Sequence, residues 1–182
     1  MLQQTQVSRV EKYYPGFLVK YPTVEAMASS HPRRVRESWD GLGYYRRAAN
    51  LHRLAQQVVG EYHGTIPSKP EELENLPGVG RYTAGAVASF AYGRRVPAMD
   101  TNVARVIRRA FHPRTGQGAQ AEARLHSTAA ELLPRRAVDV WAFNQAIMEL
   151  GALICTARVA RCSICPVHRT CATGRRRLPN QP

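Results

Sequence analysis

The stretch Leu76-Pro77-Gly78-Val79-Gly80 decides the fold, because it joins two helical patterns by one short turn. Pro77 ends the first helix, and Gly78 and Gly80 permit positive φ angles and leave the backbone uncovered. The second helix then begins with free N–H groups and a positive dipole end, which suit a phosphate, and Arg81 adds a cation. The stretch therefore predicts a helical hairpin, which is either a plain connection or a site for a DNA phosphate. The candidate DNA contacts are Leu76, Gly78, Val79, Gly80 and Arg81.

Helical spacing of apolar residues continues on both sides of this hairpin. In the pattern that starts near Thr101, four apolar residues recur at intervals of three or four, as on the buried face of a helix. These are Val103, Val106, Ile107 and Ala110, and Val7, Val10, Tyr14 and Phe17 mark a similar face of a first helix. Further helices are expected over residues 44–63, 81–92, 120–133 and 139–154. No pair of segments shows the alternation of strands, so the predicted fold class is all-α.

Basic residues outnumber acidic residues in this chain. Its 182 residues include 26 lysines and arginines against 13 aspartates and glutamates, for a formal net charge of +13. A genome rich in G and C would explain why only Lys12, Lys20 and Lys69 are lysines, but not the net excess. The excess favours a polyanionic partner, most often nucleic acid. A hydrophobic share of 44% excludes a disordered chain.

Two features bear on the cellular compartment. No apolar run approaches the ~20 residues that cross a bilayer, and Met1–Gln6 lacks the pattern of a signal peptide. All 4 cysteines lie between Cys155 and Cys171, whereas a secreted disulfide protein would spread them through the fold. We therefore expect a cytoplasmic protein that contacts no membrane and uses its cysteines as metal ligands.

An aspartate follows the hairpin at the start of the next helix. Asp100 lies in Pro97-Ala98-Met99-Asp100-Thr101-Asn102-Val103, where an aspartate is by itself more often a helix N-cap. The order of helix, L-P-G-V-G, helix and aspartate resembles the helix-hairpin-helix DNA glycosylases that include endonuclease III. The resemblance implies that Asp100 is catalytic, and Asn102 of the same motif is a further candidate. A carboxylate there would stabilise positive charge on a deoxyribose whose glycosidic bond breaks.

Tyr82 separates two branches of that family. Members such as endonuclease III carry a lysine at this position, which forms a Schiff base with the sugar. A phenol cannot form one, and no lysine of this chain lies near the motif in sequence. The resemblance therefore implies a monofunctional glycosylase in which Tyr82 hydrogen-bonds in the catalytic site. The alternative is that Tyr82 is a packed aromatic side chain.

The segment Leu2-Gln3-Gln4-Thr5-Gln6-Val7 resembles the branch that removes adenine from mismatches. Gln3, Gln4 and Thr5 are candidate DNA contacts, because an amide both donates and accepts hydrogen bonds. Without the resemblance, such a segment would be read as polar surface.

The segment from Gly41-Leu42-Gly43-Tyr44 to His52 resembles the same branch. A base inside a duplex must be flipped out before an enzyme can cut its glycosidic bond. Leu42 and Tyr44, on a glycine-flanked turn, are candidates to wedge into the base stack. The alternative is the start of a helix with aromatic side chains in the core.

The cysteines complete the resemblance. Their spacing, Cys155-x6-Cys162-x2-Cys165-x5-Cys171, contains one C-x-x-C unit, whereas zinc sites usually pair two. The spacing resembles the [4Fe–4S] loop of this family, which implies that the four thiolates hold such a cluster. Zinc is the alternative.

The resemblance spans almost the whole chain and implies a base excision repair enzyme. Its substrate would be double-stranded DNA with adenine mispaired with guanine or 8-oxoguanine, and its product an abasic site. The resemblance also implies a six-helix-barrel lobe with the hairpin over residues 1–112 and a helical cluster lobe over residues 113–182. We further expect a monomer in a bacterial cytoplasm, associated with the nucleoid through DNA.

Two departures from the family pattern modify this expectation. The family's general acid is a glutamate two residues before the position of Met1, and its C-terminal domain, which helps to recognise 8-oxoguanine, would follow Pro182. We therefore expect residues 1–182 by themselves to excise adenine slowly. The alternatives are a DNA-binding relative without activity and a mismatch glycosylase for another base.

Overall fold

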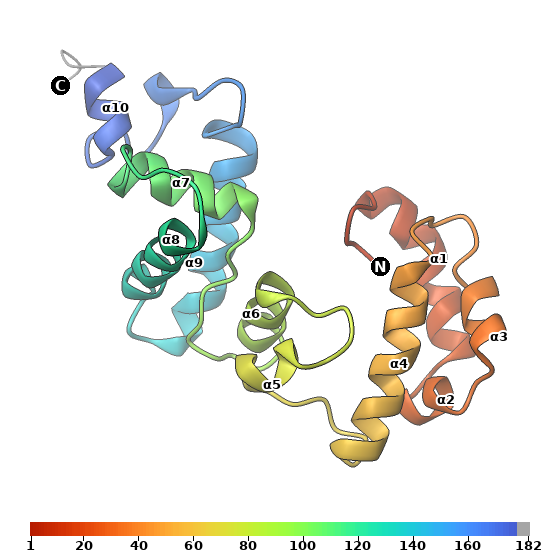
Figure 1. Ribbon diagram of the computed structural model, residues 1–182. Helices are drawn as coiled ribbons and strands as arrows, with labels where there is room; N and C mark the ends of the chain where they lie inside the picture. Colours follow the sequence, from red (N-terminus) through yellow and green to blue (C-terminus); the bar gives the residue numbers. More distant parts are fainter. Residues whose placement is uncertain (178–182) are drawn as a thin grey trace. The chain divides into compact units, whose positions relative to one another are not determined.

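The fold is built from helices. The computed structural model describes residues 1–177, and the only strand-like pairing among them is an isolated bridge between Cys155 and Ala160. The predicted all-α class is confirmed. In chain order the elements are α1 (Val7–Lys20), α2 (Val24–Ala28), α3 (Pro32–Glu37), α4 (Arg46–Glu61), α5 (Pro70–Glu74), α6 (Arg81–Phe90), α7 (Thr101–Phe111), α8 (Ala119–Leu132), α9 (Ala137–Glu149), the π-helix η1 (Leu150–Ile154), the 3-10 helix η2 (Cys162–Ile164) and α10 (Ala172–Arg177) (Figure 1).

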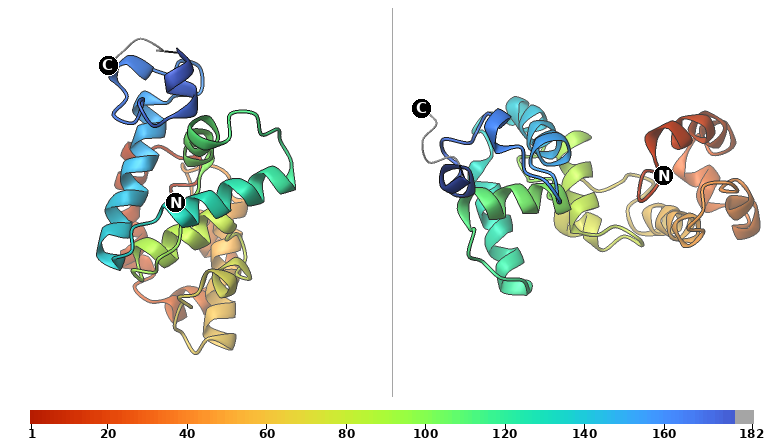
Figure 2. Two further views of the ribbon diagram at one scale, coloured as in Figure 1. Left: turned by 90° about the vertical axis from the view of Figure 1, so that its left-hand side faces the viewer. Right: turned by 90° about the horizontal axis from the view of Figure 1, so that it is seen from above.

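Packing divides the chain into two compact units, Met1–Gly80 and the residues from Arg81 onward. In the first unit α2 and α3 lie against α4, as the views in Figure 2 also show. The core of this unit includes Phe17 and Trp39, whose rings meet edge to face with centroids 5.7 Å apart. This aromatic contact joins α1 to the segment between α3 and α4.

The second unit is organised around α7, which packs against α8, α9, η1 and α10. Its four predicted core residues are all buried, which confirms the apolar face. The compact units divide after Gly80, and α7 packs on the C-terminal helices within the second unit. The six-helix-barrel lobe and the cluster lobe stay predictions.

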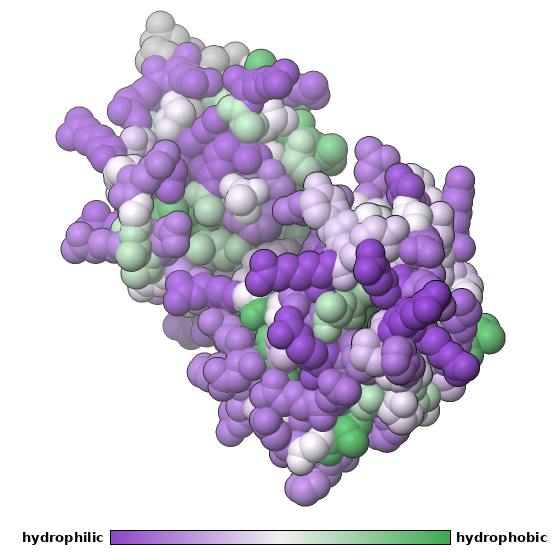
Figure 3. All heavy atoms as spheres, turned by 45° about the vertical axis from the view of Figure 1, so that its right-hand side comes forward, coloured by the Kyte–Doolittle hydropathy of each residue, from purple (hydrophilic) through white to green (hydrophobic). Residues whose placement is uncertain are grey.

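Hydrophilic residues cover most of the face shown in Figure 3, in keeping with the net charge of +13. In α1, the side chains of Val7 and Tyr14 are 60% and 50% exposed. Their spacing had placed them on a buried face, but only Val10 and Phe17 of that face are buried. The helix thus forms as predicted, but its buried face is narrower than the predicted one.

One stretch of the second unit is more apolar than we expected. Ala137–Ile154, which combines α9 and η1, is 18 residues long and apolar enough to cross a membrane by length and composition alone. Asn144 near its middle is buried and bonds side-chain and backbone atoms of the same unit. Such contacts are typical of a helix that packs within a folded unit. That the protein contacts no membrane stays a prediction.

Candidate functional site

Asp100 is the N-cap of α7 and is half-buried. Its Oδ1 accepts a hydrogen bond from the Val103 N–H over 2.8 Å, and its Oδ2 accepts one from Asn102 Nδ2 over 2.8 Å. These two bonds fix the orientation of the carboxyl group at the positive end of the helix dipole. The capping role and a catalytic role are compatible, because each oxygen keeps a lone pair for a further partner.

Tyr82, in the first turn of α6, shares the electrostatic environment of Asp100. Tyr82 is 40% exposed. Burial raises the pKa of Tyr82 above its usual value of 10.0, and the negative charge of Asp100 raises it further. The phenol therefore keeps its proton at neutral pH.

A chain of hydrogen bonds runs from Asp100 to the first cysteine. Asn102 donates to Asp100, and its own Oδ1 accepts from Arg105 Nη2 over 2.8 Å. Arg105 Nε donates to the Cys155 carbonyl over 2.9 Å, and its Nη2 donates to the Gly151 carbonyl over 2.7 Å. Asn102 is therefore placed to orient Asp100. Sequence analysis missed Arg105, which belongs to no motif.

Asn144 holds the segment that leads to Asp100. It is 2% exposed, and its Oδ1 accepts from the Ala98 N–H over 3.2 Å. Its Nδ2 donates to Ser89 Oγ over 2.9 Å and to the Val96 carbonyl over 3.0 Å. Sequence analysis missed this residue as well. The available signal was a polar side chain inside an apolar helical pattern, which has to find partners when buried.

The four cysteines come together around one small pocket, and all are free thiols. Two of their sulfurs accept hydrogen bonds, from Arg109 Nη1 to Cys155 Sγ and from the Gly174 N–H to Cys171 Sγ, each over 3.3 Å. Burial raises the pKa of the Cys165 thiol, and the charges of the other three cysteines raise it as well. The predicted ligands Cys155, Cys162, Cys165 and Cys171 therefore share one site.

This set of donors fits an iron–sulfur cluster. Four thiols are the ligands that such clusters use, and N–H groups directed at sulfur tune a cluster's potential. Within residues 1–177, no three Cys, His, Asp or Glu side chains gather closely enough to hold a single metal ion. A cluster of four irons spreads its ligands over a wider space than one ion does. The four thiols are therefore compatible with the predicted cluster.

The hairpin is a tight turn in the first unit. The Val79 N–H donates to the Leu76 carbonyl over 3.1 Å and Gly78 has a φ of 80°, as in a type II turn. A Cβ on Gly78 would lie 2.7 Å from Asn50 Nδ2, so the close approach also requires glycine. Leu76, which we expected at the DNA, is 2% exposed and anchors the turn in the core instead. The exposed positions are Gly78, Gly80 and Arg81.

The side chain of Arg47 connects two turns by hydrogen bonds: the glutamine-rich turn, which comprises residues 2–6, and the turn Gly41–Tyr44. Arg47 donates to the carbonyls of Met1 and Gln3 and, over 2.9 Å, to Thr5 Oγ1. The same guanidinium donates to two carbonyls of the other turn, each over 3.2 Å. Sequence analysis missed this role, because one arginine among many carries no local signal.

Tyr44 is the side chain that the second turn exposes. It is 62% exposed and has a φ of 48°, and with Gly43 at 69° it prevents α4 from beginning at the expected residue 44. Leu42, the other expected wedge, is 4% exposed and packs in the core of the first unit. In the glutamine-rich turn, Gln4 is exposed with a φ of 57°, and Gln3 Nε2 donates to the Gly78 carbonyl over 3.4 Å.

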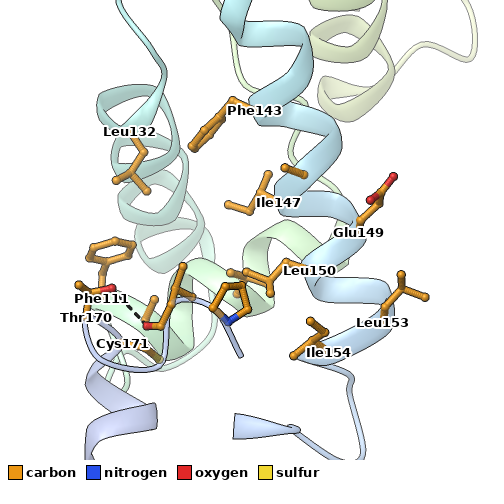
Figure 4. A pocket seen from close by; sticks show the side chains of 15 residues that line it. Phe111, Leu132, Phe143, Ile147, Glu149, Leu150, Leu153, Ile154, Thr170 and Cys171 are labelled. Carbon is orange, nitrogen blue, oxygen red and sulfur yellow. Dashed lines mark hydrogen bonds between the residues drawn. The ribbon is translucent and has the colours of Figure 1, made fainter. Parts of the chain in front are cut away.

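A separate apolar pocket lies in the second unit (Figure 4). Phe111, Phe143 and Ile147 are among the side chains that line it, and its volume is about 480 Å³. Asp100 does not line it, and of the four cysteines only Cys171 does. The pocket is therefore not where the predicted chemistry takes place.

Known proteins are similar to this chain in sequence and in fold. A family model described as "HhH-GPD superfamily base excision DNA repair protein" matches residues 1–135. The adenine DNA glycosylase of Mycobacterium tuberculosis (strain CDC 1551 / Oshkosh) is 46% identical over 167 residues, which are 92% of this chain and 55% of that protein. The chain thus spans about half the length of the curated relatives that it matches.

Two solved structures match most of the chain. The structure of a thermostable thymine-DNA glycosylase matches with a TM-score of 0.83 at 29% identity, over 96% of this chain and 80% of that one. The structure of a trapped endonuclease III–DNA covalent intermediate matches with a TM-score of 0.78 at 26% identity, also over 96% and 80%. Both structures agree with the helical fold that was predicted from the hairpin motif.

Proposed function

Since the chain belongs to the HhH-GPD superfamily of base excision DNA repair proteins, we propose that it removes adenine mispaired with guanine or 8-oxoguanine from double-stranded DNA. The observation that carries the proposal is the geometry of Asp100, whose two oxygens are held at 2.8 Å by Val103 and Asn102. The glutamine-rich turn and the identity to an adenine DNA glycosylase support adenine as the base.

In this proposal Asp100 acts on charge that develops during bond cleavage. The electron pair of the N-glycosidic bond leaves with adenine, and positive charge develops on the deoxyribose. A carboxylate that is already oriented stabilises this charge without reorganisation. Water then bonds to the anomeric carbon, loses a proton and leaves an abasic site. The departing adenine takes up a proton, so the reaction also requires a proton donor close to the base.

The reaction stops at hydrolysis, because Tyr82 is no Schiff-base nucleophile. Its raised pKa keeps the phenol protonated, and a phenol has no amine to condense with an aldehyde. The chain's three lysines, Lys12, Lys20 and Lys69, all lie outside the hairpin motif in the sequence. Borohydride should therefore trap little covalent adduct between protein and DNA.

We also propose that Cys155, Cys162, Cys165 and Cys171 hold a [4Fe–4S] cluster. When bound, the cluster supplies a redox-active group and energy of ligation that stabilises the second unit. Protein purified without air should be yellow-brown and contain about four irons per chain, as this cluster type requires. Stoichiometric zinc without visible absorbance would overturn the assignment.

Single-turnover release of free base from a panel of duplexes tests the proposed substrate. The panel pairs adenine with 8-oxoguanine, guanine or thymine, and includes thymine opposite guanine. We expect release of adenine from the first two duplexes only. Release of thymine would favour the glycosylase for another base, and tight binding of the mispairs without release would favour the inactive relative.

A further inference from the structure

A basic pocket of the first unit lies outside the proposed site. It is a groove of about 510 Å³ between α3 and α4, which lie side by side (Figure 1). Arg33, Arg36 and Arg53 line it, and no acidic residue does. Three guanidinium groups along one groove repel each other, so an anion between them would lower the electrostatic energy.

A buried histidine at this groove lacks a partner. His52 on α4 lines the pocket and is only 4% exposed. Its Nε2 is buried and has no hydrogen-bond partner. Leaving a buried polar atom unpaired is costly, and such an atom in a folded protein calls for an explanation. A ligand that accepts a hydrogen bond from the ring would supply the missing partner.

The arginines are oriented by neighbours and keep further donors. Arg33 Nε donates to Glu37 Oε1 over 2.9 Å, and Arg53 Nη2 donates to Asn50 Oδ1 over 2.7 Å. The Arg36 guanidinium lies 5.1 Å from the centroid of the Tyr45 ring. A guanidinium has five N–H donors, so each of the first two retains N–H groups for a second partner.

We propose that this pocket binds a phosphate group. Its oxygens would accept from His52 Nε2 and from the guanidinium groups of Arg33 and Arg53, whose fork geometry matches phosphate. The half-exposed ring of Tyr45 offers a stacking surface for a base attached to that phosphate. The phosphate group comes either from the DNA backbone or from a free nucleotide or inorganic phosphate.

Titration of histidine-labelled protein with inorganic phosphate, followed by NMR, tests the site without any readout of base excision. The signal of His52, assigned from its loss in His52→Gln, should move and saturate. Substituting Arg33→Gln and Arg53→Gln together should weaken phosphate binding about tenfold or more, because two charge-assisted contacts are lost. Deoxyadenosine monophosphate should bind more tightly than phosphate if its base stacks on Tyr45.

A matched control removes two other charges from the same two helices. Arg34→Gln with Arg46→Gln changes exposed arginines of α3 and α4 that do not line the pocket. Phosphate binding should stay within about twofold of the unmodified protein, since neither side chain lines the pocket. A His52 signal that does not move, or an equal loss in both double variants, overturns the proposal. If the first pair fails to fold, His52→Phe provides a second test, because it removes Nε2 and keeps a ring; its phosphate binding is followed by isothermal titration calorimetry and should weaken.

Duplex DNA distinguishes the two sources of phosphate. For a backbone phosphate, saturating DNA blocks the response of His52 to added phosphate, and the Arg33/Arg53 variant lowers the salt slope of DNA binding by about one. For a free ligand, His52 responds to phosphate equally with and without DNA, and the salt slope is unchanged. Either result supports the phosphate site and assigns its occupant.

Discussion

The two units hold their candidate functional loops in different ways. In the second unit, the segment before Asp100 is anchored by Asn144, which is 2% exposed. In the first unit, the two turns with candidate DNA contacts are joined by Arg47, which is only partly buried. A buried anchor leaves unpaired groups in the protein interior when it is removed, whereas a partly buried one is replaced by water. The first anchor therefore contributes mainly to stability, and the second mainly to loop geometry.

The largest expected effect in this comparison is on catalysis by Asp100. Asp100→Asn keeps an oxygen that accepts from the Val103 N–H but removes the negative charge. Single-turnover excision of adenine should slow by about 10²–10³-fold, the range for losing one electrostatic contact to a transition state. Binding of the mispaired duplex should change little.

A second aspartate provides the control. Asp139 lies in the first turn of α9 and pairs with Arg136 at the surface. Asp139→Asn removes a charge near another helix N-terminus and should leave the excision rate unchanged. Equal slowing in both variants would show that net charge, and not the position of Asp100, determines the rate.

Replacing the buried anchor should have the next largest effect. Asn144→Ala leaves the Ala98 N–H and the Val96 carbonyl without their partner. We expect the free energy of unfolding to fall by about 3 kcal/mol, because each buried unpaired group costs about 1–3 kcal/mol. Denaturant unfolding measures this change. Asn75→Ala, at an exposed position after α5, is the matched control and should stay near the unmodified value.

The sequence predicted local features well and long-range anchors not at all. The starts of α6 and α7, the buried face of α7 and the capping position of Asp100 follow from residues within a few positions of one another. The bond from Asn144 to Ala98 joins residues 46 positions apart, and no pattern near either residue reveals it. The hairpin and the cysteine spacing were informative because each motif is contiguous in the chain.

Leu42 shows a second limit of sequence reasoning. A leucine on a glycine-flanked turn fits a wedge between bases and a core side chain equally well. The structure buries it at 4% exposure, because the turn folds back onto the aromatic core of the first unit. Tyr44 next to it is exposed, since its positive φ directs the chain away from α4 geometry. Only the backbone angles separate the two roles.

Replacing Arg47, the partly buried anchor of the first unit, should affect DNA binding more than stability. Arg47→Lys keeps the charge but not the fork that spans both turns. We expect affinity for a mispaired duplex to fall about tenfold, or ~1.4 kcal/mol, with a smaller change in unfolding than for Asn144→Ala. Fluorescence anisotropy measures the affinity. Arg46→Lys, at the exposed neighbouring position, should retain it. If Arg47→Lys destabilised the protein as much as Asn144→Ala does, the proposed distinction between the units would be wrong.

The smallest expected effect concerns pH and tests the environment that Tyr82 shares with Asp100. Burial and then the charge of Asp100 raise the pKa of Tyr82 above 10.0 in the folded protein. The protonated phenol is thus favoured by folding. Its contribution to stability is complete below the unfolded pKa and is lost as the pH rises through the folded pKa. The denaturant midpoint should therefore fall as the pH rises above 10.0, and less steeply in Tyr82→Phe than in the unmodified protein.

Tyr92→Phe is the matched control for this measurement, because Tyr92 is 41% exposed and Tyr82 is 40% exposed. Comparing it with Tyr82→Phe separates the effect of the position of Tyr82 from the loss of one phenol. In Asp100→Asn the slope should lie between those of the unmodified protein and Tyr82→Phe, because burial still raises the pKa of Tyr82 after the neighbouring charge is gone. A slope that Asp100→Asn leaves unchanged would mean that burial alone sets the Tyr82 pKa. The phenol and the carboxylate would then not act in one electrostatic site.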